Sequence, residues 1–307
     1  MNSTQPVTNY NLEFSQWHFV LTQIGNVSAI LCNAFLFFIY SISKELNKSF
    51  TNTLFSSLAF VDAITSSFFI YKSAFESQVN PPTGILGSIY CRLIYTTYLM
   101  WASIAVSWYH IIAITFDRFV AVTFPHHYDD LIKPPKNLRI LLLCCYFLGA
   151  ISLLPNVWMG ELKKKQCVYT IPSTFQTTYF FVNSISFVAI VTICIGSMYS
   201  TIIYKVLSKS SYNKSVSSQQ KRATSICIIL VTEFVLCSYP NMIYFSGYLG
   251  QENFGIPLGL SLDSFAYWSS VQLVNMSSLL NPLLYMNQNK TFRKAVKRQY
   301  KNLQKKF

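Results

Sequence analysis

Charged side chains are scarce in this chain. Only 11% of the 307 residues are Asp, Glu, Lys or Arg, against about 25% in an ordinary soluble domain. Hydrophobic residues make up 52% of the chain and aromatic residues 16%. So few charges exclude a soluble globular domain of ordinary composition, and the chain is predicted to be a membrane protein.

The apolar residues gather in seven blocks. Each block is close to the roughly 20 residues that a helix needs to cross the hydrocarbon core of a bilayer. The alternation with period two that marks the strands of a membrane barrel is absent, so we expect helices. The sequence predicts an all-α membrane protein, a seven-transmembrane helix bundle, with spans near 18–42, 52–75, 92–123, 138–159, 178–207, 223–249 and 257–286.

Basic residues are almost missing from one set of connections between these blocks. Most of the 24 Lys and Arg residues fall near 43–51, 118–139 and 205–222 and in the tail after 286. Because basic loops stay in the cytoplasm, these segments are predicted to face inward, and the odd number of spans places the N-terminus outside. We expect a multi-pass protein of the plasma membrane. The net charge of +13 is attributed to inner loops that face anionic lipid, and binding of nucleic acid is not expected.

The first sixteen residues contain no Lys or Arg, so the basic start of a cleavable signal peptide is missing. Residues 1–17 are therefore expected to form an extracellular tail in front of a membrane domain at 18–286. In this tail, Asn2-Ser3-Thr4 is a glycan acceptor sequence, which predicts glycosylation of Asn2.

Residues 287–307 are predicted to form a cytoplasmic amphipathic helix and a short tail. Apolar residues recur at helical steps from Phe292 to Phe307, and Lys and Arg fill most other positions. Such a helix would lie on the anionic lipid of the inner leaflet. No Ser or Thr follows Thr291, so the serines of 208–218 are the expected phosphorylation sites on the cytoplasmic side.

Six of the eight cysteines lie inside predicted spans, where they act as small apolar residues. Cys91 and Cys167 lie on the predicted outer side, which is oxidising. A disulfide between them is the natural expectation, and two free thiols are the alternative.

Ionisable residues are rare within the spans, where they are costly and usually functional. On the seventh span, Ser278 and Asn281 share a face, and Asp62 and Ser107 stand at similar depth on the second and third. If these faces converge, their oxygens form a buried cluster that suits a small hard cation such as Na⁺, with Asn33 as a supporting amide. No other cofactor is expected.

The stretch Asn281-Pro282-Leu283-Leu284-Tyr285 combines an amide, a helix-breaking proline and a tyrosine. Pro282 removes a backbone donor and bends the helix, so the stretch predicts a hinge, with a static kink as the alternative.

Glu233 on the sixth span has two possible interpretations. Its carboxyl group is either neutral and donates a hydrogen bond across the bundle, or belongs to a polar relay near Asn281.

Several short motifs in one order and spacing resemble the rhodopsin-like (class A) G-protein-coupled receptors over nearly the whole chain. These are Asn33; Asn52 through Ser57-Leu58-Ala59 to Asp62; Phe116-Asp117-Arg118-Phe119; Pro125; Cys237-Ser238-Tyr239-Pro240; Asn281-Pro282-Leu283-Leu284-Tyr285; and Asn289 through Lys294.

The resemblance implies a receptor, not an enzyme, that binds an extracellular ligand and activates a heterotrimeric G protein by opening its cytoplasmic side. Arg118 would pair with Asp117 at rest and contact the G-protein α-subunit on activation. Tyr199 and Tyr285 would stabilise the open form. The remaining implied roles are a sixth-helix pivot at Phe234 and Pro240, a hinge at Asn281 and Pro282, and a sodium site at Asp62, Ser107, Ser278 and Asn281.

The chain departs from the family pattern at several positions. Cys145 and Ser238 stand where tryptophans are usual, Val191 where a proline is usual, and Phe119 where a tyrosine is usual. Cys91 also lies two residues further from Arg118 than is typical. A bulge or a longer outer loop is therefore expected beside the disulfide.

The resemblance also limits the ligand. Met100 stands where amine receptors carry an Asp, and Asn275 where light receptors carry the Lys that binds retinal, so neither ligand is expected. A peptide or a neutral small molecule, including a chemosensory one, is favoured. The predicted ligand pocket consists of Met100, Trp101, Ile104, Asn183, Asn241, Phe245, Tyr267, Val271 and Asn275.

A transporter or channel and an intramembrane enzyme are the alternatives to a receptor. A transporter or channel would predict inverted repeats or paired broken helices, which the two halves of the chain do not show. An intramembrane enzyme would need a nucleophile with its base or a His-Glu-x-x-His motif, and the sequence contains neither. His110, alone within a span, is expected to be a packed polar residue.

Overall fold

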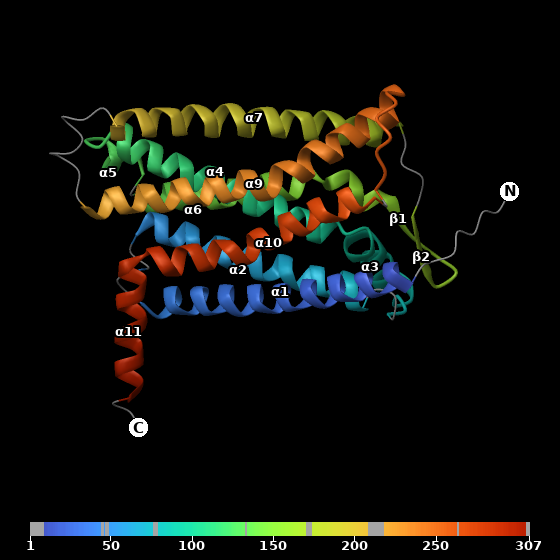
Figure 1. Cartoon of the computed structure of the whole chain (residues 1–307), viewed down its shortest axis with the longest axis horizontal. Coiled ribbons are helices and arrows are strands. Elements are labelled where there is room, and N and C mark those ends of the chain that lie inside the picture. Colours follow the sequence, from blue (N-terminus) through green and yellow to red (C-terminus); the bar gives the residue numbers. More distant parts are fainter. Residues whose placement is uncertain are drawn as a thin grey trace.

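A computed structural model describes residues 9–43, 46, 49–75, 79–132, 134–169, 174–207, 218–262 and 264–304. Seven long helices form the bundle (Figure 1). They are α1 (Asn9–Ile42), α2 (Phe50–Ile70), α4 (Tyr98–Thr123), α6 (Pro135–Ser152), α7 (Thr174–Leu207), α9 (Ser218–Phe254) and α10 (Phe265–Gln288). The fold class predicted from the sequence is confirmed.

Shorter elements connect or extend these helices. They are the π-helical turns η1 (Tyr71–Phe75) and η3 (Cys91–Tyr95), helices α3 (Gly84–Tyr90) and α5 (Tyr128–Leu131), the 3₁₀ turn η4 (Leu154–Met159), strands β1 (Gly160–Lys163) and β2 (Gln166–Tyr169), and α11 (Lys290–Gln304).

Helix α4 is the central rod of the bundle. It packs against α2, α6, α7 and α9, while α1 closes the ring between α2 and α10. Within the span of α4, 67% of the most apolar window is buried, against 17% for α7. Side chains on α4 can therefore contact four other long helices.

Six of the described helices are long and apolar enough to cross a membrane by length and composition. The seventh, α10, is more polar because its inward face carries Ser270, Asn275, Ser278 and Asn281, all of which are buried. Its 24 residues nevertheless exceed the roughly 20 that a membrane span needs, and it packs against α1, α2 and α9. The polar residues of α10 therefore face the interior of the bundle.

Two predicted span boundaries are wrong. The seventh helix begins at Phe265 rather than at 257, because Gly255 and Gly259 have φ values of +64° and +67° and Pro257 lies between them. The fourth helix ends at Ser152, and 154–159 continue as the 3₁₀ turn η4, which starts around Pro155. In both cases apolar composition extended the predicted span through residues that break an α-helix.

The predicted third span, 92–123, is also not one continuous helix. The π-helical turn η3 is followed by Thr97, whose φ of 59° is left-handed, and α4 starts only at Tyr98. This irregular segment is the bulge expected from the wide spacing between Cys91 and Arg118.

Cys91 and Cys167 form the expected disulfide, with their Cα atoms 5.3 Å apart. Cys167 lies on β2, which pairs antiparallel with β1, so the nearly all-helical chain also contains one two-stranded hairpin. At Gly160 the hairpin approaches η3 so closely that a Cβ atom would lie 2.3 Å from the carbonyl oxygen of Cys91. Only glycine fits this approach.

Helix α11 runs across the direction of the long helices at one end of the bundle (Figure 1). Phe292 and Ala295 are buried against the bundle, whereas the described basic residues of α11 are exposed. The helix therefore has one anchored apolar edge and one basic face, as its sequence pattern predicts. Below, its end of the bundle is called the Arg118 end, and the opposite end the Cys91 end.

Candidate functional site

A buried ion pair closes the Arg118 end. Asp117 and Arg118 stand at the last turns of α4, and the Arg118 Nη2 atom lies 2.5 Å from Asp117 Oδ2. Arg118 Nε also donates to that oxygen at 2.9 Å. Asp117 is fully buried and Arg118 is 7% exposed, so the pair is strongly shielded from water. Removing one partner of such a pair leaves an uncompensated buried charge.

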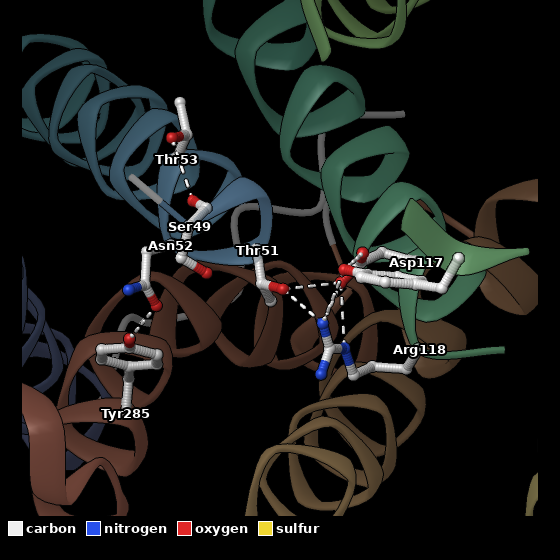
Figure 2. A network of polar contacts seen from close by, with 8 residues as sticks. Ser49, Thr51, Asn52, Thr53, Asp117, Arg118 and Tyr285 are labelled. Atoms are coloured by element: carbon white, nitrogen blue, oxygen red, sulfur yellow. Dashed lines mark hydrogen bonds and ion pairs between the residues drawn. The ribbon is translucent and has the colours of Figure 1, made fainter. Parts of the chain in front are cut away.

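Two side chains outside α4 complete this lock, defined as Asp117, Arg118, Thr51 and Tyr128. Thr51, in the first turn of α2, donates its hydroxyl to Asp117 Oδ2 at 2.7 Å and accepts from Arg118 (Figure 2). Tyr128 of α5 donates to Asp117 Oδ1 at 2.7 Å. Burial, followed by the negative charge of Asp117, raises the pKa of Tyr128 above its ordinary range, so this phenol remains a donor at neutral pH.

The structure thus places Asp117 and Arg118 as predicted, and adds Thr51 and Tyr128. The sequence gives a weak signal for both: Thr51 precedes the Asn52 motif, and Tyr128 follows the Pro125 position. Among the described residues, the side-chain partners of Arg118 come from α2, α4 and α5 and not from α9. Release of Arg118 therefore requires its hydrogen bonds to Asp117 and Thr51 to break.

A second polar link joins α10 to α2 at the same end. The Tyr285 hydroxyl donates to Asn52 Oδ1 at 2.9 Å (Figure 2), and Asn289 donates to the Tyr285 hydroxyl. The ring of Tyr285 lies 4.3 Å from that of Phe55 and 5.9 Å from that of Phe292 of α11, measured between centroids. Tyr285 is thus buried where α2, α10 and α11 meet.

Tyr199 occupies a separate place between α7 and α9. Its hydroxyl donates to the backbone oxygen of Cys227 at 2.6 Å. The resemblance implies that Tyr199 and Tyr285 both stabilise an open form. Here the Tyr199 hydroxyl bonds to Cys227 and the Tyr285 hydroxyl bonds to Asn52.

The predicted polar cluster forms at mid-depth. Ser107 donates to Asp62 Oδ1 at 2.7 Å, and Asn281 Nδ2 donates to Asp62 Oδ2 at 3.0 Å. The structure places Ser278 beside them, with its backbone oxygen accepting from Asn33 at 2.7 Å. Four helices, α1, α2, α4 and α10, therefore meet through these side chains.

A small cavity of about 10 Å³ opens at this cluster, and its lining includes Asp62, Ser107, Ser278 and Asn281. That volume holds about one water-sized particle. Asn281 Oδ1 is buried and has no hydrogen-bond partner. A carboxylate, a hydroxyl and an unpaired amide oxygen around one small space fit a hard cation of the size of Na⁺.

Two further polar groups on α9 are buried without partners. Glu233 is 8% exposed, and its two carboxyl oxygens have no hydrogen-bond partner among the described residues. The Ser238 hydroxyl is fully buried and has no hydrogen-bond partner either.

Pro240 on α9 and Pro282 on α10 each lie inside a helix that continues past them.

The hinge stretch is thus partly explained by contacts. The amide nitrogen of Asn281 donates to Asp62 and not to the backbone groups released by Pro282. Four residues after Asn281, the Tyr285 hydroxyl donates to Asn52. The helix changes partner from the polar cluster to the Arg118 end within one turn. Pro282 lies between these two contacts, where a bend moves one relative to the other.

A larger cavity of about 340 Å³ opens toward the Cys91 end. Its described lining comes from α4, the end of α6 with η4, α7, α9 and the start of α10, and from neither α1 nor α2. The lining residues are Trp101, Ala105, Trp108, Ser152, Leu153, Asn156, Met159, Thr177, Phe180, Asn183, Ser184, Phe187, Asn241, Met242, Phe245, Tyr248, Leu249, Glu252, Leu262 and Tyr267.

The predicted ligand residues divide into two groups. Five line this cavity: Trp101, Asn183, Asn241, Phe245 and Tyr267. Met100, Ile104 and Val271 instead pack with Phe69 and Val274 in an apolar cluster between α2, α4 and α10. Asn275 is also buried outside the lining, and its Oδ1 atom is unpaired.

The difference arises because Met100, Ile104 and Val271 pack with Phe69 and Val274 between α2, α4 and α10, whereas the cavity lies between α4, α7 and α9. The sequence did not indicate the contribution of α6 and η4, where Ser152 and Asn156 reach the cavity. Asn183 Nδ2 donates to the Ser152 carbonyl oxygen at 3.1 Å, and Asn241 Nδ2 donates to Ser270 Oγ at 3.1 Å.

His110 occupies a polar junction outside both cavities. Its Nδ1 atom lies 2.8 Å from the Val106 carbonyl oxygen, which only accepts, so Nε2 accepts from the Ser57 hydroxyl at 2.9 Å. That hydroxyl also lies 2.8 Å from the Tyr146 hydroxyl. This chain joins α2, α4 and α6 beside Cys145, where the family carries a tryptophan, and His110 is a packed polar residue as expected.

Comparisons with known proteins agree with this geometry. The family described as 7 transmembrane receptor (rhodopsin family) matches residues 32–285. The melatonin receptor type 1A of Gallus gallus is 23% identical over 290 residues, which cover 91% of this chain and 76% of the relative.

Two other relatives are similarly distant. The trace amine-associated receptor 2 of Homo sapiens is 24% identical over 303 residues, covering 90% of this chain and 78% of the relative. The proteinase-activated receptor 1 of Xenopus laevis is 25% identical over 251 residues, covering 74% and 53%. With most of its length matched by the family, this chain belongs to the rhodopsin-like, class A G-protein-coupled receptors, which are receptors rather than enzymes.

Proposed function

We propose that this receptor binds its ligand in the 340 Å³ cavity and activates a heterotrimeric G protein by opening the Arg118 end. The observation that carries the proposal is the lock of Asp117, Arg118, Thr51 and Tyr128, which closes the end of the bundle opposite to the cavity. The N-terminus would then be extracellular at the plasma membrane, in agreement with the basic loops at the Arg118 end.

The proposed cycle is a two-state equilibrium. In the closed form the Arg118 guanidinium is satisfied by Asp117 and Thr51. In the open form it would be available to the G-protein α-subunit, with Tyr199 and Tyr285 stabilising the separated helices and Phe234 and Pro240 forming the pivot of α9. A ligand shifts this equilibrium only by its difference in affinity for the two forms.

The cavity favours a compact neutral ligand. Its volume lies within the range of small-molecule sites, and most of its lining is apolar or aromatic. None of the described lining residues is basic, and Glu252 is the one carboxylate among them, so an anionic ligand is disfavoured. Asn183 and Asn241 offer amide oxygens to a ligand N–H or O–H group. A peptide would have to insert a small neutral end.

The names of the relatives do not select among ligands. They refer to melatonin, trace amines and a proteinase, which are three different chemical kinds. The lack of an Asp at Met100 still argues against an amine held by a buried ion pair.

We further propose that Asp62, Ser107, Ser278 and Asn281 hold a sodium ion in the closed form. Bound there, the ion would supply positive charge to the Asp62 carboxylate. The bond between Ser107 and Asp62 joins α4 to α2, and the bond between Asn281 and Asp62 joins α10 to α2. An intact cluster therefore keeps both α4 and α10 against α2.

Two interactions are proposed at the cytoplasmic side. The exposed basic face of α11 would bind anionic lipid of the inner leaflet, because the helix lies across the bundle axis (Figure 1). Arrestin would bind phosphorylated serines of 208–218, most of which lie outside the described residues. Asn2, the proposed glycan site, also lies outside the described residues.

Expression in reporter cells with a panel of chimeric G proteins tests the proposed function. Wild type and Arg118→Ala would be compared at equal surface level, before and after addition of pooled neutral small molecules and peptides. We expect signalling above that of Arg118→Ala with at least one G protein. Identical signals from the two proteins under every condition would contradict the proposal.

A further inference from the structure

Two lysines form the turn of the hairpin between β1 and β2. Lys163 faces Gln166 across the strands, so Lys164 and Lys165 are the two residues of the loop. Their φ values are +48° and +65°, and both are therefore left-handed. A two-residue loop with positive φ at both positions is a type I′ turn, for which Asn-Gly is the preferred sequence. Because lysine carries a Cβ atom, both positions are strained.

The charges of the turn add to this strain. Lys163, Lys164 and Lys165 are adjacent and exposed, and their like charges repel one another. Lys163 Nζ lies 2.9 Å from Glu161 Oε2, which neutralises one of the three charges. Among the described residues, neither Lys164 nor Lys165 has an ion-pair partner. The tip of the hairpin thus carries two positive charges that no described contact within the fold requires.

The hairpin that carries these lysines is anchored at its base. The disulfide joins Cys167 of β2 to Cys91 of η3, and β1 packs against both η3 and η4. The Tyr169 hydroxyl donates to the Tyr95 carbonyl oxygen at 2.7 Å, and the two rings lie 4.8 Å apart between centroids. Figure 1 shows the hairpin at the end of the bundle opposite to α11. The two charges are therefore held in one place at the Cys91 end.

The tip of the hairpin lies within reach of the 340 Å³ cavity. Met159 lines that cavity, and β1 begins at the next residue, Gly160. At about 3.4 Å per residue, the steps along β1 from Met159 to Lys164 span about 17 Å. An extended peptide whose neutral end fills the cavity would reach the lysines about five residues further along. None of the described cavity residues is basic, so the hairpin is the part of this end that can bind acidic side chains.

We propose that Lys164 and Lys165 bind acidic residues of a peptide ligand whose neutral end enters the cavity. The proposal rests on the proposed function and deepens it, because it names the chemistry of the ligand outside the cavity. A strained backbone that the fold itself does not need is typical of residues kept for binding. A sulfated polysaccharide fits less well, because such a chain gains affinity from many simultaneous ion pairs and the turn offers two.

Binding of a fluorescent peptide of six glutamates to intact cells tests the proposal, because only the outer face of the receptor is then accessible. Fluorescent heparin is measured in parallel. The neutral variant combines Lys164→Asn with Lys165→Gly, and the basic variant combines Lys164→Arg with Lys165→Arg. The control combines Glu161→Gln with Lys163→Gln, which removes the ion pair of the same hairpin without changing its net charge.

We expect the neutral variant to bind the glutamate peptide about fivefold more weakly than wild type at equal surface level. The basic variant and the control should stay within about twofold of wild type. At the same time, the melting temperature of the purified neutral variant should rise by about 2 °C or more, because its turn has the preferred sequence. Binding and stability are therefore expected to change in opposite directions.

Equal binding of the glutamate peptide by wild type and the neutral variant would overturn the proposal. A loss confined to heparin would overturn it as well, since the surface would then serve a polysaccharide. A melting temperature that does not rise would contradict the strain on which the proposal depends. Failure of the proposed function would be seen separately, as equal signals from wild type and Arg118→Ala, because binding to intact cells requires no G protein.

Discussion

The two ends of the bundle are held together by different kinds of interaction. At the Arg118 end, a few buried side chains form charge-assisted hydrogen bonds with defined geometry. At the Cys91 end, a disulfide, a short hairpin and an apolar cavity define the structure. Hydrogen bonds between specified residues can be replaced by other specified bonds, which suits a switch. A cavity formed by many apolar side chains tolerates change, which suits adaptation to a ligand.

The largest effect is expected from breaking the lock at Asp117. Asp117→Asn leaves the buried Arg118 guanidinium without a compensating charge, which costs the closed form about 3 kcal/mol. Ligand-independent signalling should rise strongly at equal surface level. Asp130→Asn removes an exposed carboxylate from the same connection and serves as the control. Equal signals from the two variants would show that the pair does not hold the receptor closed.

The disulfide provides the corresponding test at the other end. Replacement of both Cys91 and Cys167 by Ser should lower the free energy of unfolding by about 3 kcal/mol, because the cross-link restricts the unfolded chain. Thermal unfolding of the purified protein measures this loss. Replacement of the exposed free Cys144 by Ser should leave the melting temperature unchanged. A double variant as stable as wild type would contradict the structural role of the bridge.

Tyr128 should have a smaller effect than Asp117. Tyr128→Phe removes one hydrogen bond to a charged acceptor and should destabilise the closed form by about 1.5 kcal/mol, which raises ligand-independent signalling. The raised pKa of Tyr128 means that the contribution of its protonated hydroxyl is complete below the ordinary tyrosine pKa and is lost only above the raised value.

The difference between wild type and Tyr128→Phe should therefore be constant from about pH 6 to pH 9. It can be followed as nucleotide exchange on a fused G-protein α-subunit in membranes of set pH. A difference that disappears within this range would show that the phenol is not the donor to Asp117.

The smallest effect is expected within the cavity. With a ligand found by the screen, Asn183→Ala should weaken potency about fivefold to tenfold through loss of one neutral hydrogen bond. Ile104→Val removes one methylene outside the lining and should leave potency unchanged. Dose-response curves at equal surface level measure both. The opposite order would place the ligand against the α2 and α10 side of the interior.

The sequence predicts the Arg118 end better than the Cys91 end for the same physical reason. Asp117, Arg118, Asp62 and Asn281 are rare polar residues in apolar surroundings, so each one had to have a partner. Met100, Ile104 and Val271 are ordinary apolar residues, and helical periodicity places them inside the bundle without showing which neighbours close over them. Their burial comes from packing with Phe69 of α2 and Val274 of α10, which no single segment of the sequence shows.

The sequence also does not show which side chains on other helices occupy the space of a side chain that is missing from a motif. The missing ring at Ser238 is visible in the motif, but the ring of Trp108 that meets Phe234 belongs to another helix. In the same way, Ser57, His110 and Tyr146 form their junction beside Cys145 from three helices. The close approach of α6 to α4 there requires Gly149, where a Cβ atom would lie 2.3 Å from a methyl carbon of Val106.

The irregular segment before α4 has a consequence for any alignment with a relative. Each residue of an α-helix turns by about 100°, so two additional residues correspond to about 200° of rotation. The π-helical turn and the left-handed Thr97 absorb that rotation above α4. Contact residues transferred by counting from the disulfide would therefore fall on the opposite face of α4. Counting backward from Arg118 keeps the register of the helix that carries Trp101, Ala105 and Trp108.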